Sequence, residues 1–180
     1  MNEALIQKVS EFINESFPAG RNTPTHLQIT ADCVKELKPK ADVALIIAAL
    51  SHDIDRGFVK RHIAEDQFNK QPYLKDHQES SANIISEFLR KNDADEELVK
   101  RVWHLVSKHE EGGDEDQNIL KDADSLSFFR GRNVESIARN HPEIPLKPKI
   151  AWLYERITSD KAKELAKPLY EKALKLAEQL

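Results

Sequence analysis

The sequence predicts an all-α fold. Apolar residues recur every three or four positions along nearly the whole chain, and no segment alternates between apolar and polar residues as a half-buried strand would. The 180 residues suffice for one domain with a sizeable core. The only candidate boundary is the proline-containing stretch HPEIPLKP, at 141–148. We therefore expect a single helical domain over residues 1–180 that ends in an amphipathic helix.

The first three helices follow from the spacing of apolar residues. The first should stop before Pro18 and bury one face made of Leu5, Val9, Phe12 and Ile13. The second is expected to begin after the stretch NTPT, with Thr23 or Thr25 as its cap, and to carry His26 on its apolar face. The third covers about residues 41–53 and is the most apolar of all.

Further helices are expected beyond a polar connection with weak periodicity. The fourth carries His77 on its apolar face, and the fifth runs from near Asp95 to Gly112. The sixth covers the stretch NILKDADSLSFF. The proline-rich stretch RNHPEIPLKPK reads as a loop, and the C-terminal helices lie within about 149–180.

Composition excludes several classes of function. The net charge of -4 argues against nucleic-acid binding driven by global charge. Cys33 is the only cysteine, so an internal disulfide is excluded and a reducing cytosol is the natural setting. Glu3 and Lys8 interrupt any signal-peptide pattern, and the longest apolar run, eight residues, is too short to cross a bilayer. We expect a cytoplasmic protein; the oligomeric state stays open.

Histidines and aspartates fall on the apolar faces of five expected helices. The set is His26, His52, Asp53, His77, His109 and Asp124. Burying so many ionisable groups is very costly unless something binds them, and a divalent metal is the obvious binder. Imidazole and carboxylate together suit borderline metals better than Ca²⁺. One or two ions fit the pattern, and Mn, Fe, Co, Ni, Mg and Zn are all open.

The order of these residues resembles a known family. His26, then His52-Asp53 at the end of LIIAALSHDIDRG, then Asp124 in KDADSLSFF are similar to the H…HD…D ligand set of the HD-domain superfamily of metal-dependent phosphohydrolases. The resemblance covers about residues 20–130 and implies an HD-domain-like helical bundle around the metal. In two-metal members, two further histidines bind a second ion, and His77 and His109 stand at about the right places.

Two of these assignments have rivals. Asp122 competes with Asp124, although Asp124 falls four residues after Leu120 and matches the family's closing segment. His104 competes with His109, but an offset of five residues turns it about 140° away from the apolar stripe. Four ligands could also hold a single metal, which would leave His77 and His109 to substrate phosphate or to packing.

The charged residues after His52-Asp53 are expected at the mouth of the site. Arg56, Lys60 and Arg61 suit phosphate oxygens, because guanidinium binds them in a bidentate manner and ammonium acts as a point charge. Asp55 is expected at the rim, where it could exchange a proton with water or the leaving group, alongside Asp53 as the second catalytic carboxylate. No glutamate follows closely, so the assisting acid or base stays open.

The resemblance implies a metal-dependent phosphohydrolase. Its substrate would be a small phosphorylated compound, such as a nucleotide, attacked at phosphorus by metal-activated water. Two other functions remain open: an HD-type di-iron oxygenase, whose six-ligand pattern matches equally well, and a non-catalytic nucleotide-binding or regulatory module.

Overall fold

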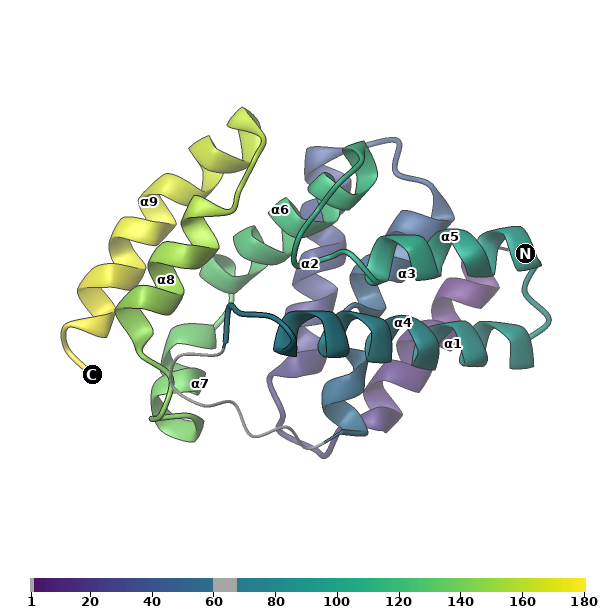
Figure 1. The fold of residues 1–180 in the computed structure, drawn as a ribbon, viewed down its shortest axis with the longest axis horizontal. Coiled ribbons are helices and arrows are strands. Elements are labelled where there is room, and N and C mark those ends of the chain that lie inside the picture. Colours follow the sequence, from purple (N-terminus) through teal and green to yellow (C-terminus); the bar gives the residue numbers. More distant parts are fainter. Residues whose placement is uncertain (1, 60–67) are drawn as a thin grey trace.

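The computed structural model describes residues 2–59 and 68–180, and these residues form helices joined by turns (Figure 1). This confirms the predicted fold class. The elements are α1 (Asn2–Ser16), α2 (Thr23–Leu37), α3 (Val43–Ser51), the short 3₁₀ helix η1 (Ile54–Gly57), α4 (Tyr73–Lys91), α5 (Glu96–Val106), α6 (Glu115–Arg130), α7 (Asn133–Asn140), α8 (Leu146–Glu155) and α9 (Asp160–Ala177). Within the described ranges, none of these helices is both long enough and apolar enough to cross a bilayer.

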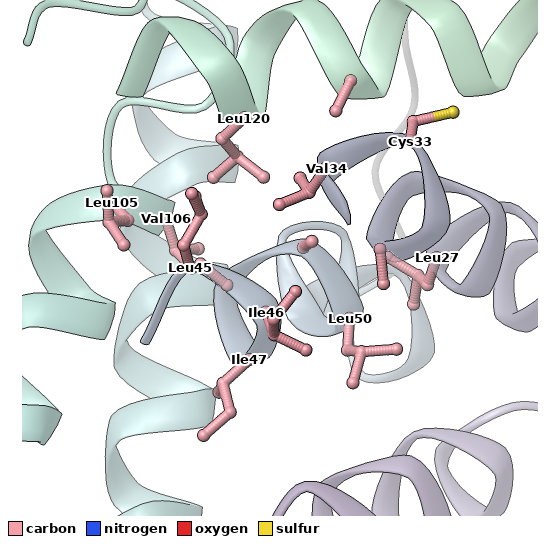
Figure 2. Packing of buried hydrophobic residues seen from close by; sticks show 14 of the residues in the cluster. Leu27, Cys33, Val34, Leu45, Ile46, Ile47, Leu50, Leu105, Val106 and Leu120 are labelled. Atoms are coloured by element: carbon pink, nitrogen blue, oxygen red, sulfur yellow. The ribbon is translucent and has the colours of Figure 1, made fainter. Parts of the chain in front are cut away.

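Helix α3 lies at the centre of the core. It contacts α1, α2, α5 and α6, and every residue from Ala44 to Ser51 is buried. Figure 2 shows side chains of α3 among those of α2, α5 and α6; it labels Leu45, Ile46, Ile47, Leu50, Leu27, Val34, Leu105, Val106 and Leu120. Burying one such side chain contributes about 1.5–3 kcal/mol. The continuous apolar run is therefore the scaffold on which the residues after it are held.

The two ends of α3 are set by polar side chains. Asp42 caps its start, with the carboxylate accepting a hydrogen bond from the Leu45 backbone N–H at 2.9 Å. The helix ends at Ser51, two residues earlier than predicted, and Asp53 occupies the cap position of η1. His52 and Asp53 thus lie at the break between two helices, where consecutive side chains can point to different places.

Several predicted helix boundaries are wrong. Helix α2 begins at Thr23, after Asn22, so neither Thr23 nor Thr25 is its cap. Helix α5 ends at Val106 rather than near Gly112. Helix α7 was not predicted, and α8 begins inside the expected proline-rich loop. Proline is tolerated in the first turn of a helix, so Pro148 helps to start α8 instead of preventing it.

Helix α9 packs on α6, α8 packs on α9, and this C-terminal pair lies at one end of the long axis (Figure 1). The turn between them is fixed by a buried carboxylate. Asp122 of α6 accepts hydrogen bonds from the Thr158 backbone N–H at 2.8 Å, the Thr158 hydroxyl at 2.9 Å and the Ser159 backbone N–H at 2.8 Å. Ser159 in turn caps α9. This anchor places α8 beside the residues that follow Asp122.

Candidate metal centre

The six predicted ligands lie together in two groups of three. In each group the ligand atoms lie within 4.8 Å of one another, and all six residues are buried; the groups are His26, His52 and Asp124, and Asp53, His77 and His109. The rings of His52 and His109 are 5.0 Å apart, so the groups adjoin. Asp53 belongs with His77 and His109, which differs from the four-ligand arrangement expected for a single metal.

The first group joins α2, the end of α3 and α6. Asp124 Oδ1 lies 3.0 Å from His26 Nε2 and 3.3 Å from His52 Nε2. His52 Nδ1 donates a hydrogen bond to the Ala49 carbonyl at 3.0 Å. His26 Nδ1 lies 2.9 Å from Ser127 Oγ, whose own hydrogen is donated to the Asp124 carbonyl. In its neutral form each ring therefore carries its proton on Nδ1, and Nε2, on the side of Asp124, has the lone pair that a metal would use.

The second group joins the start of η1, α4 and the turn after α5. His109 lies in that turn, beyond the end of the helix, and its Nδ1 donates to the Val106 carbonyl at 2.8 Å. Its Nε2 points toward Asp53 Oδ1, 3.8 Å away. His77 faces Asp53 Oδ1 with Nε2 at 2.7 Å. The donor atoms again converge on one carboxylate oxygen.

Asp55 is fully buried, so the prediction that it lies at the rim is wrong. Its Oδ1 is 2.8 Å from His77 Nδ1 and accepts a hydrogen bond from Ser81 Oγ at 3.1 Å. It lies on the opposite side of the His77 ring from Asp53. This is the arrangement in which a carboxylate fixes the tautomer and orientation of a metal-binding histidine.

The donor set fits a divalent cation. Nε2 of His52 and Nε2 of His109 are buried, and neither has a hydrogen-bond partner in the described part of the chain. A buried polar atom left without a partner costs about 1–3 kcal/mol. Lone pairs and carboxylate oxygens that point at one another also repel unless a positive charge lies between them. Each group could hold one metal ion through two imidazoles and one carboxylate.

The carboxylate of each group also contacts an arginine through its other oxygen. Asp53 Oδ2 is 2.6 Å from Nε of Arg56, whose side chain is 37% exposed. Asp124 Oδ2 pairs with Nη2 of Arg156, which also contacts Glu110. Arg56 thus lies beside the site, as predicted for a phosphate-binding residue. Lys60 and Arg61 lie outside the described residues.

Sequence reasoning missed three charged residues around the centre. Glu110 directly follows His109 and is 9% exposed. Arg156 caps the C-terminal end of α8, and Lys149 lies within that helix with its ammonium over the Trp152 ring. Positions 149, 152 and 156 follow helical spacing and share one face of α8. That spacing was readable in the sequence, but nothing in it showed that Arg156 contacts Ser125 and Asp124 of α6.

The structure shows which residue of each rival pair lies in the candidate centre. Asp122 points to the α8–α9 turn, where it accepts the three hydrogen bonds described above, while Asp124 faces the histidines. His104 is exposed and pairs with Asp114 at 2.7 Å, while His109 is fully buried in the second group. Asp124 and His109 are therefore the residues that belong to the candidate centre.

The electrostatic surroundings keep the carboxylates ionised. Burial raises the pKa of Asp124, but Arg156 and His52 outweigh it and hold the pKa well below its usual value. Burial likewise raises the pKa of Asp53, and Arg56 and His52 bring the net pKa well below that of a free aspartate. Burial lowers the pKa of His109 to about 4. Burial also lowers the pKa of His52, but Asp124 and Asp53 reverse this and raise it above 6.5.

Metal affinity is expected to fall on acidification, starting above pH 6.5. A metal-binding imidazole must be neutral, and in the metal-free protein the raised pKa of His52 favours the protonated ring. His109 stays neutral down to about pH 4, so protons compete less strongly there. Titration of metal into the apoprotein between pH 5 and 8, followed by calorimetry, measures this. An affinity that does not change over that range would contradict the assignment of His52 as a ligand.

The fold and the site define an all-helical protein with a buried histidine–aspartate centre able to hold metal. A family model matches residues 13–177, and the chain belongs to that family, which is described as a domain of unknown function (DUF4202). Neither the curated proteins nor the solved structures gave a match to the chain. Since the family description states no activity, the function has to be argued from the site.

Proposed function

We propose that the protein is a metal-dependent phosphohydrolase related to the HD-domain superfamily. Its substrate is a small phosphorylated compound, such as a nucleotide, and activated water attacks its phosphorus. The observation that carries the proposal is the pair of buried groups, in which two histidines face one oxygen of an aspartate and an arginine faces the other. The arginines favour phosphate chemistry over a reaction of an uncharged substrate.

The residues of the chain have distinct roles in this proposal. His26, His52 and Asp124 hold one ion, and Asp53, His77 and His109 hold the other. Divalent ions bound there supply Lewis-acid polarisation of a phosphoryl oxygen and lower the pKa of water.

Two residues act beside the ligands. Arg56 contacts Asp53 through Nε, so its terminal amino groups can reach a phosphate oxygen from the partly exposed side. Asp55 acts through His77 as a positioning residue, because it touches the ring nitrogen that faces away from Asp53.

Activity is expected to vanish in strong chelator and to return with Mn²⁺ or Co²⁺. The assay uses a panel of phosphomonoesters, nucleotides and phosphodiesters with several metals, together with elemental analysis of protein purified without added metal. Full activity after confirmed metal removal would refute the proposal. Oxygen-dependent turnover by iron-loaded protein without phosphate release would point to a di-iron oxygenase. Ligand binding without turnover with any metal would point to a regulatory module.

A further inference from the structure

The ammonium of Lys149 is a cation without an acidic partner among the described residues. It lies 4.5 Å from the centre of the Trp152 ring and 5.1 Å from that of Phe68. Neither a hydrogen bond nor an ion pair joins it to the described chain. Burial lowers its pKa to about 8. Lys149 is partly buried, and among the described residues its ammonium is held by two aromatic faces and not by a hydrogen-bonded carboxylate.

Lys149 lies near the candidate metal centre. The Arg156 guanidinium lies 4.6 Å from the same Trp152 ring and pairs with Asp124, a ligand of the first group. The Lys149 ammonium also interacts electrostatically with Glu110, Arg156, Arg56 and Asp124. Lys149 of α8 and Arg156 at the C-terminal end of that helix therefore lie near the same carboxylates, Glu110 and Asp124.

The balance of charge around the centre calls for an anion once metal is bound. Among the described residues, Arg56 is paired with Asp53, and Arg156 is paired with Asp124 and Glu110. Asp53 and Asp124 would also bind the two metal ions. Two divalent cations and the ammonium of Lys149 then leave positive charge in excess, in a site where water screens little.

We propose that the α8 face formed by Lys149, Trp152 and Arg156 is an anion-binding site for the phosphoryl group. Lys149 donates from Nζ to a non-bridging phosphate oxygen, Trp152 holds the lysine in place, and Arg156 supports Asp124 and Glu110 at the rear. The inference rests on the proposed function, because it takes the ligand to be a phosphoryl group next to bound metal. The sequence predicted phosphate contacts in the segment after His52-Asp53, and this proposal places a main phosphate contact in α8 instead.

The test is binding of inorganic phosphate to the metal-loaded protein, measured by calorimetry. Lys149→Gln is expected to weaken phosphate binding about tenfold or more, the effect of losing one charge-assisted hydrogen bond, and to leave metal stoichiometry unchanged. Lys147→Gln is the matched control, because Lys147 stands on the same helix but is exposed and pairs with Glu178 at 3.1 Å. The Lys147→Gln variant should bind phosphate with the same affinity as the unchanged protein.

A second readout reports on the site itself. In a Trp103→Phe background, Trp152 is the only tryptophan, and phosphate should change its fluorescence because it draws Lys149 toward the anion. Absence of phosphate binding to metal-loaded protein, or equal affinity in Lys149→Gln, would overturn the inference.

The two proposals fail differently. Lys149-dependent phosphate binding without hydrolysis of any ester supports the site and contradicts the phosphohydrolase. Hydrolysis with an unchanged kcat/KM in Lys149→Gln supports the phosphohydrolase and contradicts the phosphate site at Lys149.

Discussion

Replacing His109 with alanine is expected to lower the metal content from two ions to one and to leave the first group loaded. His109 contributes its Nε2 only to the group with Asp53 and His77, and that atom has no other partner in the described residues. His77→Ala should give the same result, because a group of three donors cannot lose one and keep its affinity. Elemental analysis after dialysis, combined with calorimetric titration, measures the stoichiometry.

The matched control for this experiment is His104→Ala. His104 is close in sequence but exposed, and it pairs with Asp114 outside both groups, so two ions should remain. His52→Ala should instead empty the first group and keep the second. Helical content should stay nearly the same in all four variants. If neither His77→Ala nor His109→Ala changes the stoichiometry, the centre holds a single ion.

Asp122→Ala is expected to lower the free energy of unfolding by about 3 kcal/mol while the metal content stays the same. The substitution removes three hydrogen bonds and leaves the backbone N–H groups of Thr158 and Ser159 without their acceptor. Each loss of this kind costs on the order of 1 kcal/mol. Urea unfolding of the metal-free protein, followed by circular dichroism, measures the change.

Two further variants make this result specific. Asp122→Asn keeps one acceptor oxygen and should lie between the unchanged protein and Asp122→Ala. Asp32→Ala removes an exposed carboxylate that pairs with Lys35 at 3.6 Å, and it should change stability by less than about 0.5 kcal/mol. Loss of metal in Asp122→Ala with stability retained would reverse the roles of Asp122 and Asp124.

The buried histidines and aspartates of the candidate centre could be predicted because their signal is local. An ionisable residue on an otherwise apolar stripe is visible in the spacing alone, and all six such residues lie in the candidate centre. His109 lies beyond α5, which ends at Val106, yet its ring bonds to the Val106 carbonyl and is buried in the second group. The predicted burial of His109 is confirmed, although the predicted helix boundary is wrong.

The division of the ligands and their charged neighbours could not be predicted, because both depend on contacts between distant elements. Asp53 separates from His52 since the backbone breaks between them. Asp55 is turned inward by Ser81, which comes from α4. Arg156 meets Asp124 just before the α8–α9 turn, which Asp122 holds on α6. The spacing of residues along one helix does not show which distant elements it contacts.

The two groups differ in when they can be completed during synthesis. His26 meets Ser127 across 101 positions of the chain, so the first group needs α6, whereas the second needs nothing beyond His109. A nascent chain that has emerged as far as the turn after α5 already carries Asp53, His77 and His109. Closing long loops is slow relative to local contacts. The Asp53 group can therefore take up its ion first, and the Asp124 group is loaded only after α6 has left the ribosome.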